Sequence, residues 1–468
     1  MSLQSGFAGF QTNTSSLQRD ARLLNLPTEI VEHVVKQVDD RKDLSNARLA
    51  CKTLDKHAAK ELFKEVFISP EKEHVDKWTS TSRDDEIRLM ARHAIIHTHS
   101  DIEDHGLGSY REEEEVGDDF EEAVSALAMF PNLESIEIGF TPECIGSEHT
   151  YWQEVAEDAE HRENMLRLIF RAIKMRAAAD PNNRTIRKLT IVNLQNIPLR
   201  KFTSSDLFRD VMGQLEELHV TMTHEYNEHG PDHDYTRIEL QTFPRYFCSH
   251  WLEPISANLK ALSIYHEHEN WGPFPGRFNP SYISFPKLET LALGYYTIAH
   301  DDDLDWILAI KSLKKLVLAN CMVASWIRID TSNMEQWQPE THDWVEMPEE
   351  DEETWSQKFQ YKGEWNQHLD RIAEGLPNLV DFGFDTGYSS KCGMAKRDSC
   401  GVRISPRRYI CFDNGILPTH WPEADGQGNL HSWLDEGFPI NMHAETLEKD
   451  QKSLDKLMSK IKSRTQLA

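Results

Sequence analysis

The chain has 468 residues and lacks several features that would place it in a membrane or in an oxidising compartment. No stretch approaches the roughly 18 consecutive apolar residues of a membrane-spanning helix. Residues 1–20 are polar and contain no apolar core of a signal peptide. The seven cysteines are scattered and odd in number, which does not suit a disulfide framework. These absences predict a protein of the cytoplasm, the nucleus or both.

Positive charge is also in short supply, because 51 Lys and Arg residues stand against 78 Asp and Glu residues, for a net charge of −27. An acidic surface repels nucleic-acid phosphates and anionic lipid headgroups, so no nucleic acid and no membrane is expected as a partner. Hydrophobic residues nevertheless make up 39% of the chain, which is enough for a sizeable core. The length predicts about three domains or a repeat array.

Composition and patterning divide the chain into five predicted parts. They are a disordered N-terminal arm at residues 1–22, a helical unit at 23–68, a linker or helical region at 69–122, a repeat region at 123–440 with an acidic insertion at 333–358, and a C-terminal helix or tail at 441–468. Within the third part, residues 101–122 hold eleven acidic residues and one arginine. We interpret this acidic run as a solvated loop or linker.

The helical unit at 23–68 is patterned as three short helices. Pro27 suits the first turn of a helix, and apolar residues from Ile30 to Val38 recur with helical spacing. Asp43 can cap a second helix, and Leu54 lies in a third. Three helices in so few residues bury little surface, so the unit requires a partner or a neighbouring domain to complete its core.

One phrase, apolar-x-x-apolar-x-apolar, occurs seven times in the repeat region. Its first positions are Leu133, Ile186, Leu215, Leu259, Leu288, Leu313 and Leu379. Their separations are 53, 29, 44, 29, 25 and 66 residues, and three of these match the period of about 20–29 residues that is typical of leucine-rich repeats. The last two apolar positions of each phrase point to one face of a strand.

Helical patterns fit between these strands, at residues 123–130, 154–179, 204–212, 246–255, 301–310 and 364–375. The alternation predicts a mixed α/β fold, in which the three-helix unit is followed by an irregular, leucine-rich-repeat-like α/β solenoid with parallel strands. The alternative is a generic α/β domain whose strands happen to share the phrase. Residues 444–462 are predicted to form a helix that caps the array or lies in solvent.

In the predicted register, the positions between the apolar ones face away from the core and form candidate surface positions for a partner. These positions are Glu134, Glu137, Lys188, Thr190, Glu217, His219, Lys260, Ser263, Glu289, Lys315 and Val317. The sequence does not single out a binding site among them.

Residues 24–68 resemble an F-box. The matching residues are Leu26-Pro27-x-Glu29-Ile30, Val34-Val35, Asp43-Leu44, Arg48-Leu49-Ala50-Cys51-Lys52, Leu54 and Leu62-Phe63. The whole layout is similar to that of F-box proteins of filamentous fungi whose C-terminal region is a degenerate leucine-rich-repeat array. The resemblance implies a non-catalytic substrate receptor of a Skp–cullin–F-box ubiquitin ligase. Its F-box would bind the Skp-type adaptor, and through it cullin, while the repeats bind a target protein.

By motif position, the resemblance implies a set of adaptor-binding residues: Leu26, Pro27, Ile30, Val34, Leu44, Leu49, Cys51 and Lys52. Two other functions remain open. The protein could be a repeat scaffold that binds a partner outside a ligase and uses the F-box only for adaptor or structural packing. A hydrolase without a recognisable motif would require a deep pocket with converging polar groups.

No catalytic, cofactor or metal site is predicted. Two groups of histidines are interpreted as solvated loops rather than zinc sites: His224, His229 and His233 beside Asp234, and His266 with His268. Structural zinc sites bring paired ligands about two to four residues apart, and one cysteine series lacks such pairs: Cys392, Cys400 and Cys411, with His420 beyond.

Basic residues cluster at residues 391–408 of the otherwise acidic chain. One hypothesis is a docking patch for an acidic or phosphorylated segment of a target, formed by Lys396, Arg397, Arg403, Arg407 and Arg408. The alternative, which the composition favours, is that this cluster pairs with the protein's own acidic insertion, where residues 343–353 hold seven acidic residues and no Lys or Arg.

Overall fold

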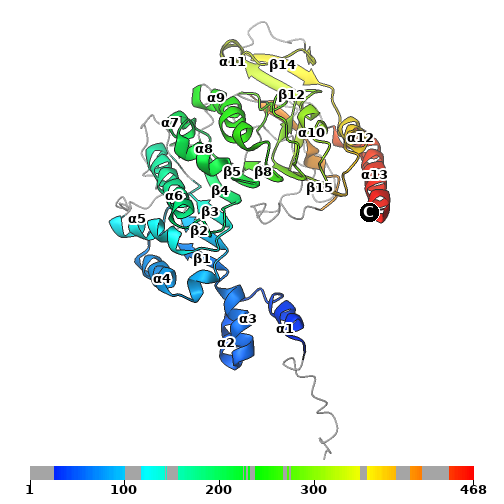
Figure 1. Ribbon diagram of the computed structural model, residues 1–468. Helices are drawn as coiled ribbons and strands as arrows, with labels where there is room; N and C mark the ends of the chain where they lie inside the picture. Colours follow the sequence, from blue (N-terminus) through cyan, green and yellow to red (C-terminus); the bar gives the residue numbers. More distant parts are fainter. Residues whose placement is uncertain are drawn as a thin grey trace, which may run out of the picture. The chain divides into compact units, whose positions relative to one another are not determined.

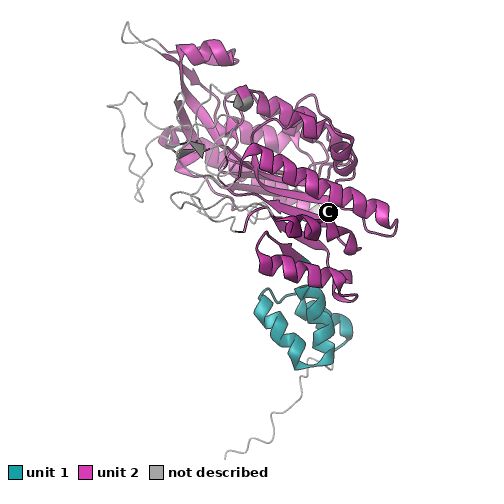
Figure 2. Cartoon of the chain, turned by 90° about the vertical axis from the view of Figure 1, so that its left-hand side faces the viewer, with its two compact units in different colours: residues 1–65 teal, residues 66–468 magenta. Residues whose placement is uncertain are grey.

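The computed structural model describes residues 26–100, 117–142, 144, 157–224, 226–227, 230–231, 238–266, 271–273, 276–347, 356–385, 401–413 and 442–467. The chain divides into two compact units, an N-terminal unit that ends at Glu65 and a large unit that begins at Val66 (Figure 2). The predicted arm at residues 1–22 lies outside the described residues, as does most of the acidic run at 101–122. A search of the helices in the described ranges found no stretch with the length and hydropathy of a membrane span.

The N-terminal unit contains three helices, α1 (Thr28–Val35), α2 (Arg41–Ala50) and α3 (Lys52–Leu62). Both α1 and α2 pack against α3. The buried core that they share is small and consists of Val35, Leu44 and Ala58, with partly buried apolar side chains around it. The described part of this unit is therefore helical, whereas residues 66–68, which the prediction assigned to it, belong to β1 of the large unit.

The large unit is built on a nine-stranded sheet whose strands follow one another in chain order. The strands are β1 (Glu65–Ile68), β2 (His93–His97), β3 (Ser135–Gly139), β4 (Lys188–Gln195), β5 (Glu217–Thr223), β8 (Ala261–His266), β9 (Thr290–Gly294), β11 (Lys315–Ala319) and β15 (Asp381–Asp385). Each neighbouring pair from β2 to β15 is parallel. The prediction of a mixed α/β fold with parallel strands is confirmed.

The apolar positions of the repeated phrase lie in register across the sheet. One row runs through Ile136, Leu189, Leu218, Leu262, Leu291, Leu316 and Phe382, which are direct neighbours on successive strands. All seven side chains are buried. Because the strands align in this way while their separations along the chain vary, the extra residues of the longer repeats lie in the connections between strands.

The residue before each strand from β3 to β11 carries a charge whose sign alternates along the sheet: Glu134, Arg187, Glu216, Lys260, Glu289 and Lys314. Each backbone N–H in this series donates to the carbonyl oxygen of the preceding member at 2.7–2.9 Å. The Lys260 ammonium lies 2.6 Å from Glu216, and Lys314 lies 2.8 Å from Glu289. Skipping one repeat would place like charges side by side, which is unfavourable, so the alternation favours the observed strand order.

Helices connect the strands: α4 (Lys72–Arg83), α5 (Asp118–Ser125), α6 (Ala159–Ala179), α7 (Arg200–Thr203), α8 (Asp206–Met212), α9 (Ile238–Tyr246), α10 (Asp305–Leu308) and α12 (Trp365–Gly375). In Figure 1, α6 and α8 run along the same side of β3–β5. A π-helical turn at Phe247–Leu252 extends α9. The region expected to be a linker contributes β2 to the sheet, because Ala94 and Ile96 alternate with half-buried neighbours and are themselves fully buried.

The predicted acidic insertion at 333–358 contributes ordered structure to a second sheet. This sheet contains β10 (Thr297–Ile298), β12 (Met322–Asp330), β13 (Trp344–Glu346), β14 (Ser356–Tyr361) and β16 (Tyr409–Asp413). Strands β12, β14 and β13 are antiparallel neighbours, whereas β10 and β16 pair with β12 in parallel. Helix α11 (Thr331–Trp337) follows β12, and residues 348–355 of the insertion lie outside the described residues.

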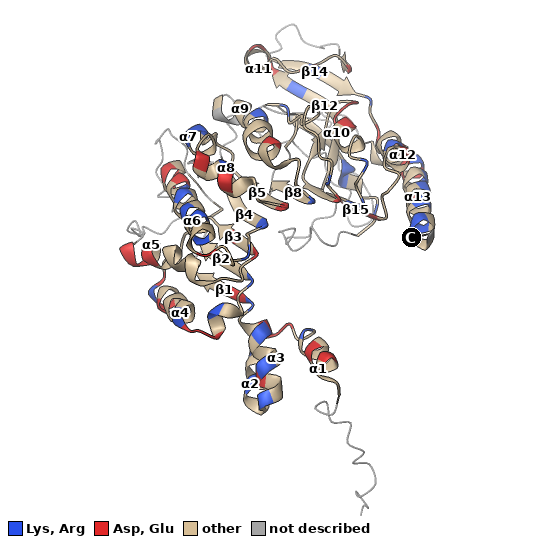
Figure 3. Cartoon of the chain, in the orientation of Figure 1, with Lys and Arg blue, Asp and Glu red and all other residues tan. Residues whose placement is uncertain are grey.

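The C-terminal helix α13 (His443–Leu467) packs against α12, so it does not lie free in solvent. Leu454, Leu457 and Ile461 are buried in this contact, while Leu447 is half exposed. Lys456 lies 3.0 Å from Asp370 of α12, and Lys449 lies 2.7 Å from Glu364. Blue segments, which mark Lys and Arg, recur along α13 in Figure 3. The prediction of a terminal helix is confirmed, and its apolar stripe is the face that meets α12.

Burial of His368 on α12 predicts a dependence of stability on pH. The side chain is 2% exposed, and burial, followed by the charge of Arg371, lowers its pKa from 6.5 to about 3. As the pH falls below 6.5, the unfolded chain takes up a proton at this residue and the folded chain does not. The free energy of unfolding therefore falls by up to about 1.4 kcal/mol for each pH unit from this group.

We expect His368→Leu to remove this contribution. The difference in unfolding free energy between the variant and the wild type should move in favour of the variant as the pH is lowered from about 7 to about 5. Denaturant unfolding at a series of pH values measures it. The contributions of all other histidines are common to both proteins and cancel, so a difference that stays constant with pH would refute the expectation.

Candidate functional site

Three apolar side chains in or just before α1 are exposed, and two of them, Ile30 and Val34, belong to the apolar stripe of the helix. Leu26 is 45% exposed, Ile30 46% and Val34 40%. Ile30 and Val34, four residues apart, lie on one face of the helix, and Leu26 lies just before its first turn. Val31 and Val35, one position further on, are buried. The stripe predicted from the sequence is therefore divided, and half of it faces away from the unit's own core.

The start of α1 explains why this face is regular from its first turn. Pro27 occupies the position before the helix, with φ −51° and ψ 143°, and its carbonyl oxygen accepts from the N–H groups of Ile30 and Val31. Its missing N–H costs nothing there. Glu29 lies in the first turn, where the helix dipole favours a negative charge. The prediction placed Pro27 inside the first turn, whereas the structure begins the helix at Thr28.

Helix α2 exposes one further apolar side chain, Leu49, which is 86% exposed. The Asp40 carboxylate caps the helix by accepting from the backbone N–H of Lys42 at 2.6 Å. Leu44 was expected to face the adaptor, and that expectation is wrong: it is 5% exposed and packs with Val35 and Ala58 inside the unit. The remaining two expected residues, Cys51 and Lys52, are half-buried and exposed respectively.

The N-terminal unit also differs from the rest of the chain in charge. Residues 26–65 contain eight basic and eight acidic side chains, whereas the whole chain carries −27. Both blue (Lys, Arg) and red (Asp, Glu) segments accordingly occur on α1–α3 in Figure 3. The exposed apolar side chains therefore lie on a surface with no net charge, and a partner of either sign meets no strong repulsion there.

Among the described residues, the predicted basic docking patch does not form a continuous free surface. Lys396 and Arg397 lie outside the described residues. Arg403 is exposed, and its guanidinium lies 2.9 Å from Asp385 at the end of β15. Arg407 is half-buried in a short turn, and Arg408 is fully buried. The described arginines therefore do not form one accessible cluster, and the acidic partners of Arg403 and Arg408 lie outside residues 343–353.

Arg408 is part of a buried polar cluster that attaches α13 to the rest of the large unit. Its Nε lies 2.7 Å from the Asp450 carboxylate, and both side chains are inaccessible to solvent. Arg408 Nη2 donates to the Thr446 hydroxyl at 2.6 Å, and the Tyr409 hydroxyl donates to Asp450 at 3.0 Å. Burial and the nearby Asp450 charge raise the pKa of Tyr409, so it remains a donor. The backbone N–H of Asn366 completes the shell of Asp450 at 2.8 Å.

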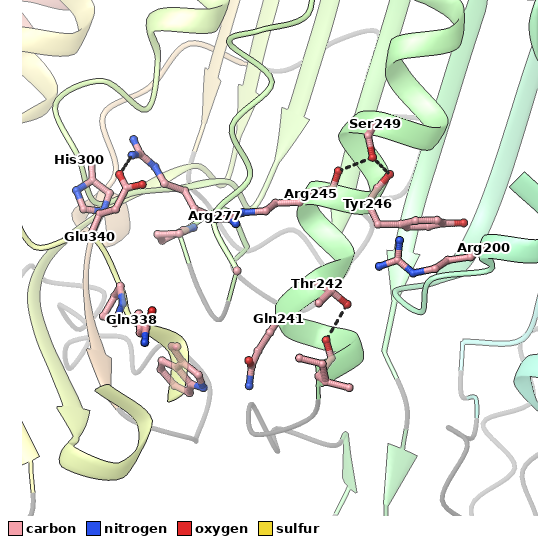
Figure 4. A pocket seen from close by; sticks show the side chains of 15 residues that line it. Arg200, Gln241, Thr242, Arg245, Tyr246, Ser249, Arg277, His300, Gln338 and Glu340 are labelled. Carbon is pink, nitrogen blue, oxygen red and sulfur yellow. Dashed lines mark hydrogen bonds and ion pairs between the residues drawn. The ribbon is translucent and has the colours of Figure 1, made fainter. Parts of the chain in front are cut away.

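A cluster of three arginines lines a cavity elsewhere, between α9 and the segment after α11. This cavity of about 450 Å³ is lined by Arg200, Arg245 and Arg277, together with Tyr246, Gln241 and Glu340 (Figure 4). Arg277 is neutralised by Asp303 at 2.8 Å, by Asp302 and by Glu340. Arg200 lies over the Tyr246 ring, 5.5 Å from its centre.

Two of these arginines keep their charge available to a ligand. Within the described part of the chain, neither Arg200 nor Arg245 has a carboxylate within ion-pair distance, and Arg245 extends from α9 toward Arg277 in Figure 4. Guanidinium groups bind carboxylates and phosphates through paired N–H donors. The cavity can therefore accept an anionic group. The sequence did not indicate it, because its arginines come from three segments spread over almost 80 residues.

Several other predicted positions are buried rather than exposed. Thr190, His219, Ser263 and Val317 are at most 5% exposed, and Val317 packs with Tyr265 and Ala292 on the second face of the sheet. His224 and His266 are also buried, with their rings stacked 5.4 Å apart, so the interpretation of solvated loops is wrong for these two. Cys411 is buried in β16. The other cysteines of its series, together with His229, His233, His268 and His420, lie outside the described residues.

A search against protein-family models and a search against curated proteins found no match to this chain.

The buried pair Arg408–Asp450 yields a stability prediction. Replacing only the arginine, in Arg408→Met, leaves the Asp450 carboxylate buried without its counter-charge, and we expect a loss of about 3–5 kcal/mol in the free energy of unfolding. The double variant Arg408→Met/Asp450→Leu should lose less than the sum of the two single variants, because neither charge is then left alone. Denaturant unfolding of the four proteins measures both effects.

A matched control is available on the same helix. Lys456 and Asp370 form an exposed pair between α13 and α12, and Lys456→Met should change stability little. Equal losses for Lys456→Met and Arg408→Met would show that burial of the Arg408 pair is not what matters.

Proposed function

We propose that this protein is the substrate-recognition subunit of a Skp–cullin–F-box ubiquitin ligase. In this proposal the N-terminal unit is an F-box that binds the Skp-type adaptor. The large unit is an irregular leucine-rich-repeat-like solenoid that holds the target protein. The chain itself performs no bond chemistry and needs no cofactor, because its role is to raise the local concentration of the target at the ligase.

The observation that carries the proposal is the uncovered apolar face of α1, formed by Leu26, Ile30 and Val34. A monomeric unit gains stability by burying such side chains, yet this unit leaves them at 40–46% exposure while burying Val31 and Val35. An amphipathic helix that exposes Ile30 and Val34 at i and i+4, with Leu26 exposed just before its first turn, suits the groove of a partner. The F-box resemblance assigns these three residues to the adaptor interface.

The proposal for the large unit is supported by the strand order and the aligned apolar rows, which suit stacked repeats. The cavity that contains Arg200 and Arg245 is the part of this unit most suited to an acidic side chain of the target. The alternative is a repeat scaffold outside a ligase. It would use the same apolar face of α1, so the two functions differ only in whether cullin is recruited.

The triple variant Leu26→Ala/Ile30→Ala/Val34→Ala tests the adaptor interface. Because these side chains are exposed, the variant should fold like the wild type, as judged by circular dichroism and thermal unfolding. Its affinity for the purified Skp-type adaptor should fall by about 100-fold or more, since each buried apolar anchor contributes on the order of 1–2 kcal/mol to binding. Isothermal titration calorimetry measures the loss.

Met175→Ala/Tyr282→Ala is the control, because these apolar side chains of the large unit are even more exposed, at 62% and 60%. It should bind the adaptor like the wild type. Cullin is measured in the same complex by pulldown: adaptor retained without cullin would favour the scaffold, and no adaptor binding by the wild type would end the F-box proposal.

A further inference from the structure

We infer that His300, His342 and Asp343 form a binding site for a zinc-type transition-metal ion at the junction of β10 and β13. Each residue offers one ligand atom, and these atoms lie within 4.8 Å of one another. It is the one such group of three within the described residues. The inference goes beyond the proposed function and does not depend on it, because the site lies in the large unit.

His300 and Asp343 are already held in place. His300 is 2% exposed, and its Nδ1 lies 2.7 Å from Asp343 Oδ1. The other carboxylate oxygen accepts from the backbone N–H of Asp301 at 2.8 Å. The Trp344 ring stacks on His300 at 5.0 Å with an angle of 9°, and its Nε1 donates to the Ala299 carbonyl at 2.7 Å. Two of the three ligands therefore need little ordering when an ion binds.

The third ligand is able to move. The side chain of His342 is 60% exposed, and its Nε2 lies 3.9 Å from Asp343 Oδ1. Its ring stacks on His300 at 5.5 Å, and the two rings are parallel within 7°. A metal ion lies in the plane of each imidazole that binds it, so His342 must turn out of the stack to share an ion with His300. Its exposure leaves room for that rotation.

The ligand types select the class of ion. Two imidazoles and one carboxylate suit a borderline ion such as Zn²⁺, with about 2.0–2.2 Å to nitrogen and oxygen and a fourth position open to water. Tetrahedral ligands at that distance lie about 3.4 Å apart. His300 Nδ1 lies 2.7 Å and His342 Nε2 lies 3.9 Å from Asp343 Oδ1, so these two separations bracket the required value, and the main change on binding is the rotation of His342. Binding at His300 Nδ1 replaces the proton that it shares with Asp343, and that proton is released to solvent.

The surroundings favour a cation and give the site a structural consequence. Asp301, Asp302 and Asp303 follow His300 directly, and Arg277 neutralises only Asp302 and Asp303 of this group. The ligands come from two segments about 40 residues apart, the bend after β10 and the turn before β13. A bound ion would therefore join two parts of the second sheet: the segment after β10, and the turn that leads into the edge strand β13. His300 also lines the arginine-containing cavity, so the ion would rigidify one wall of that cavity.

The test uses the full chain after removal of metal with a chelator, and adds Zn²⁺ alone. Bound zinc is counted by equilibrium dialysis with elemental analysis, since other histidines of the chain can contribute sites. His342→Ala should bind one equivalent less than the wild type and should lose the part of the zinc-induced rise in Tm that this site supplies. His33→Ala, an exposed histidine of α1, is the control and should bind as many ions as the wild type.

His342→Cys keeps the outcome decisive even if His342→Ala folds poorly. A cysteine thiolate is a better ligand for this class of ion, so the variant should keep the wild-type stoichiometry. With Co²⁺ in place of zinc, it should add a thiolate-to-cobalt charge-transfer absorption that the wild type lacks. If His342→Ala binds as many tight zinc ions as the wild type, or His342→Cys adds no such absorption, the site does not exist.

Discussion

Burial of the apolar face of the parallel sheet is the constraint on which the large unit depends. A single strand with its helix cannot bury its own apolar residues, so Leu189, Leu218 and Leu262 become inaccessible only because neighbouring strands lie in register. The last strand of the sheet, β15, is the one most in need of cover, because within the described residues only the short segment 401–403 hydrogen-bonds to its outer edge, at Phe384. Helix α13 covers this end by burying Leu454 and Leu457, and the enclosed Arg408–Asp450 pair holds the helix there.

The N-terminal unit, unlike the large unit, leaves part of its apolar surface exposed. Its three short helices enclose a core of only a few side chains, and the phase of α1 turns Val31 and Val35 inward while Ile30 and Val34 remain outside. A larger unit would cover them with a further element. In the N-terminal unit, the feature of most functional interest is the apolar face of α1 that the unit's own core does not cover. In the large unit, it is the cavity lined by Arg200 and Arg245, which form no ion pair with another described residue.

The errors of prediction share one physical cause, which is that residue type does not decide burial. Arg408 belongs to a basic run, yet Asp450 and Thr446, some 40 residues further on, make a buried position favourable for it. Thr190 and Val317 alternate with core residues as expected, but the second face of the sheet has a small apolar cluster of its own. Leu44 matches an interface position by motif and serves the internal core instead.

The sequence by itself determined the local and periodic features of this protein. The recurrence of an apolar phrase predicted seven strands with a common inward face, and helical spacing predicted α1–α3 and α13, because these patterns express the geometry of single elements. Only the tertiary structure decided which side of α1 is exposed, which arginines keep their charge and which histidines meet. His300 and His342 lie on different elements, and nothing in their spacing shows that β10 and β13 bring them together. Contacts of that kind depend on how the elements pack, which a local pattern does not contain.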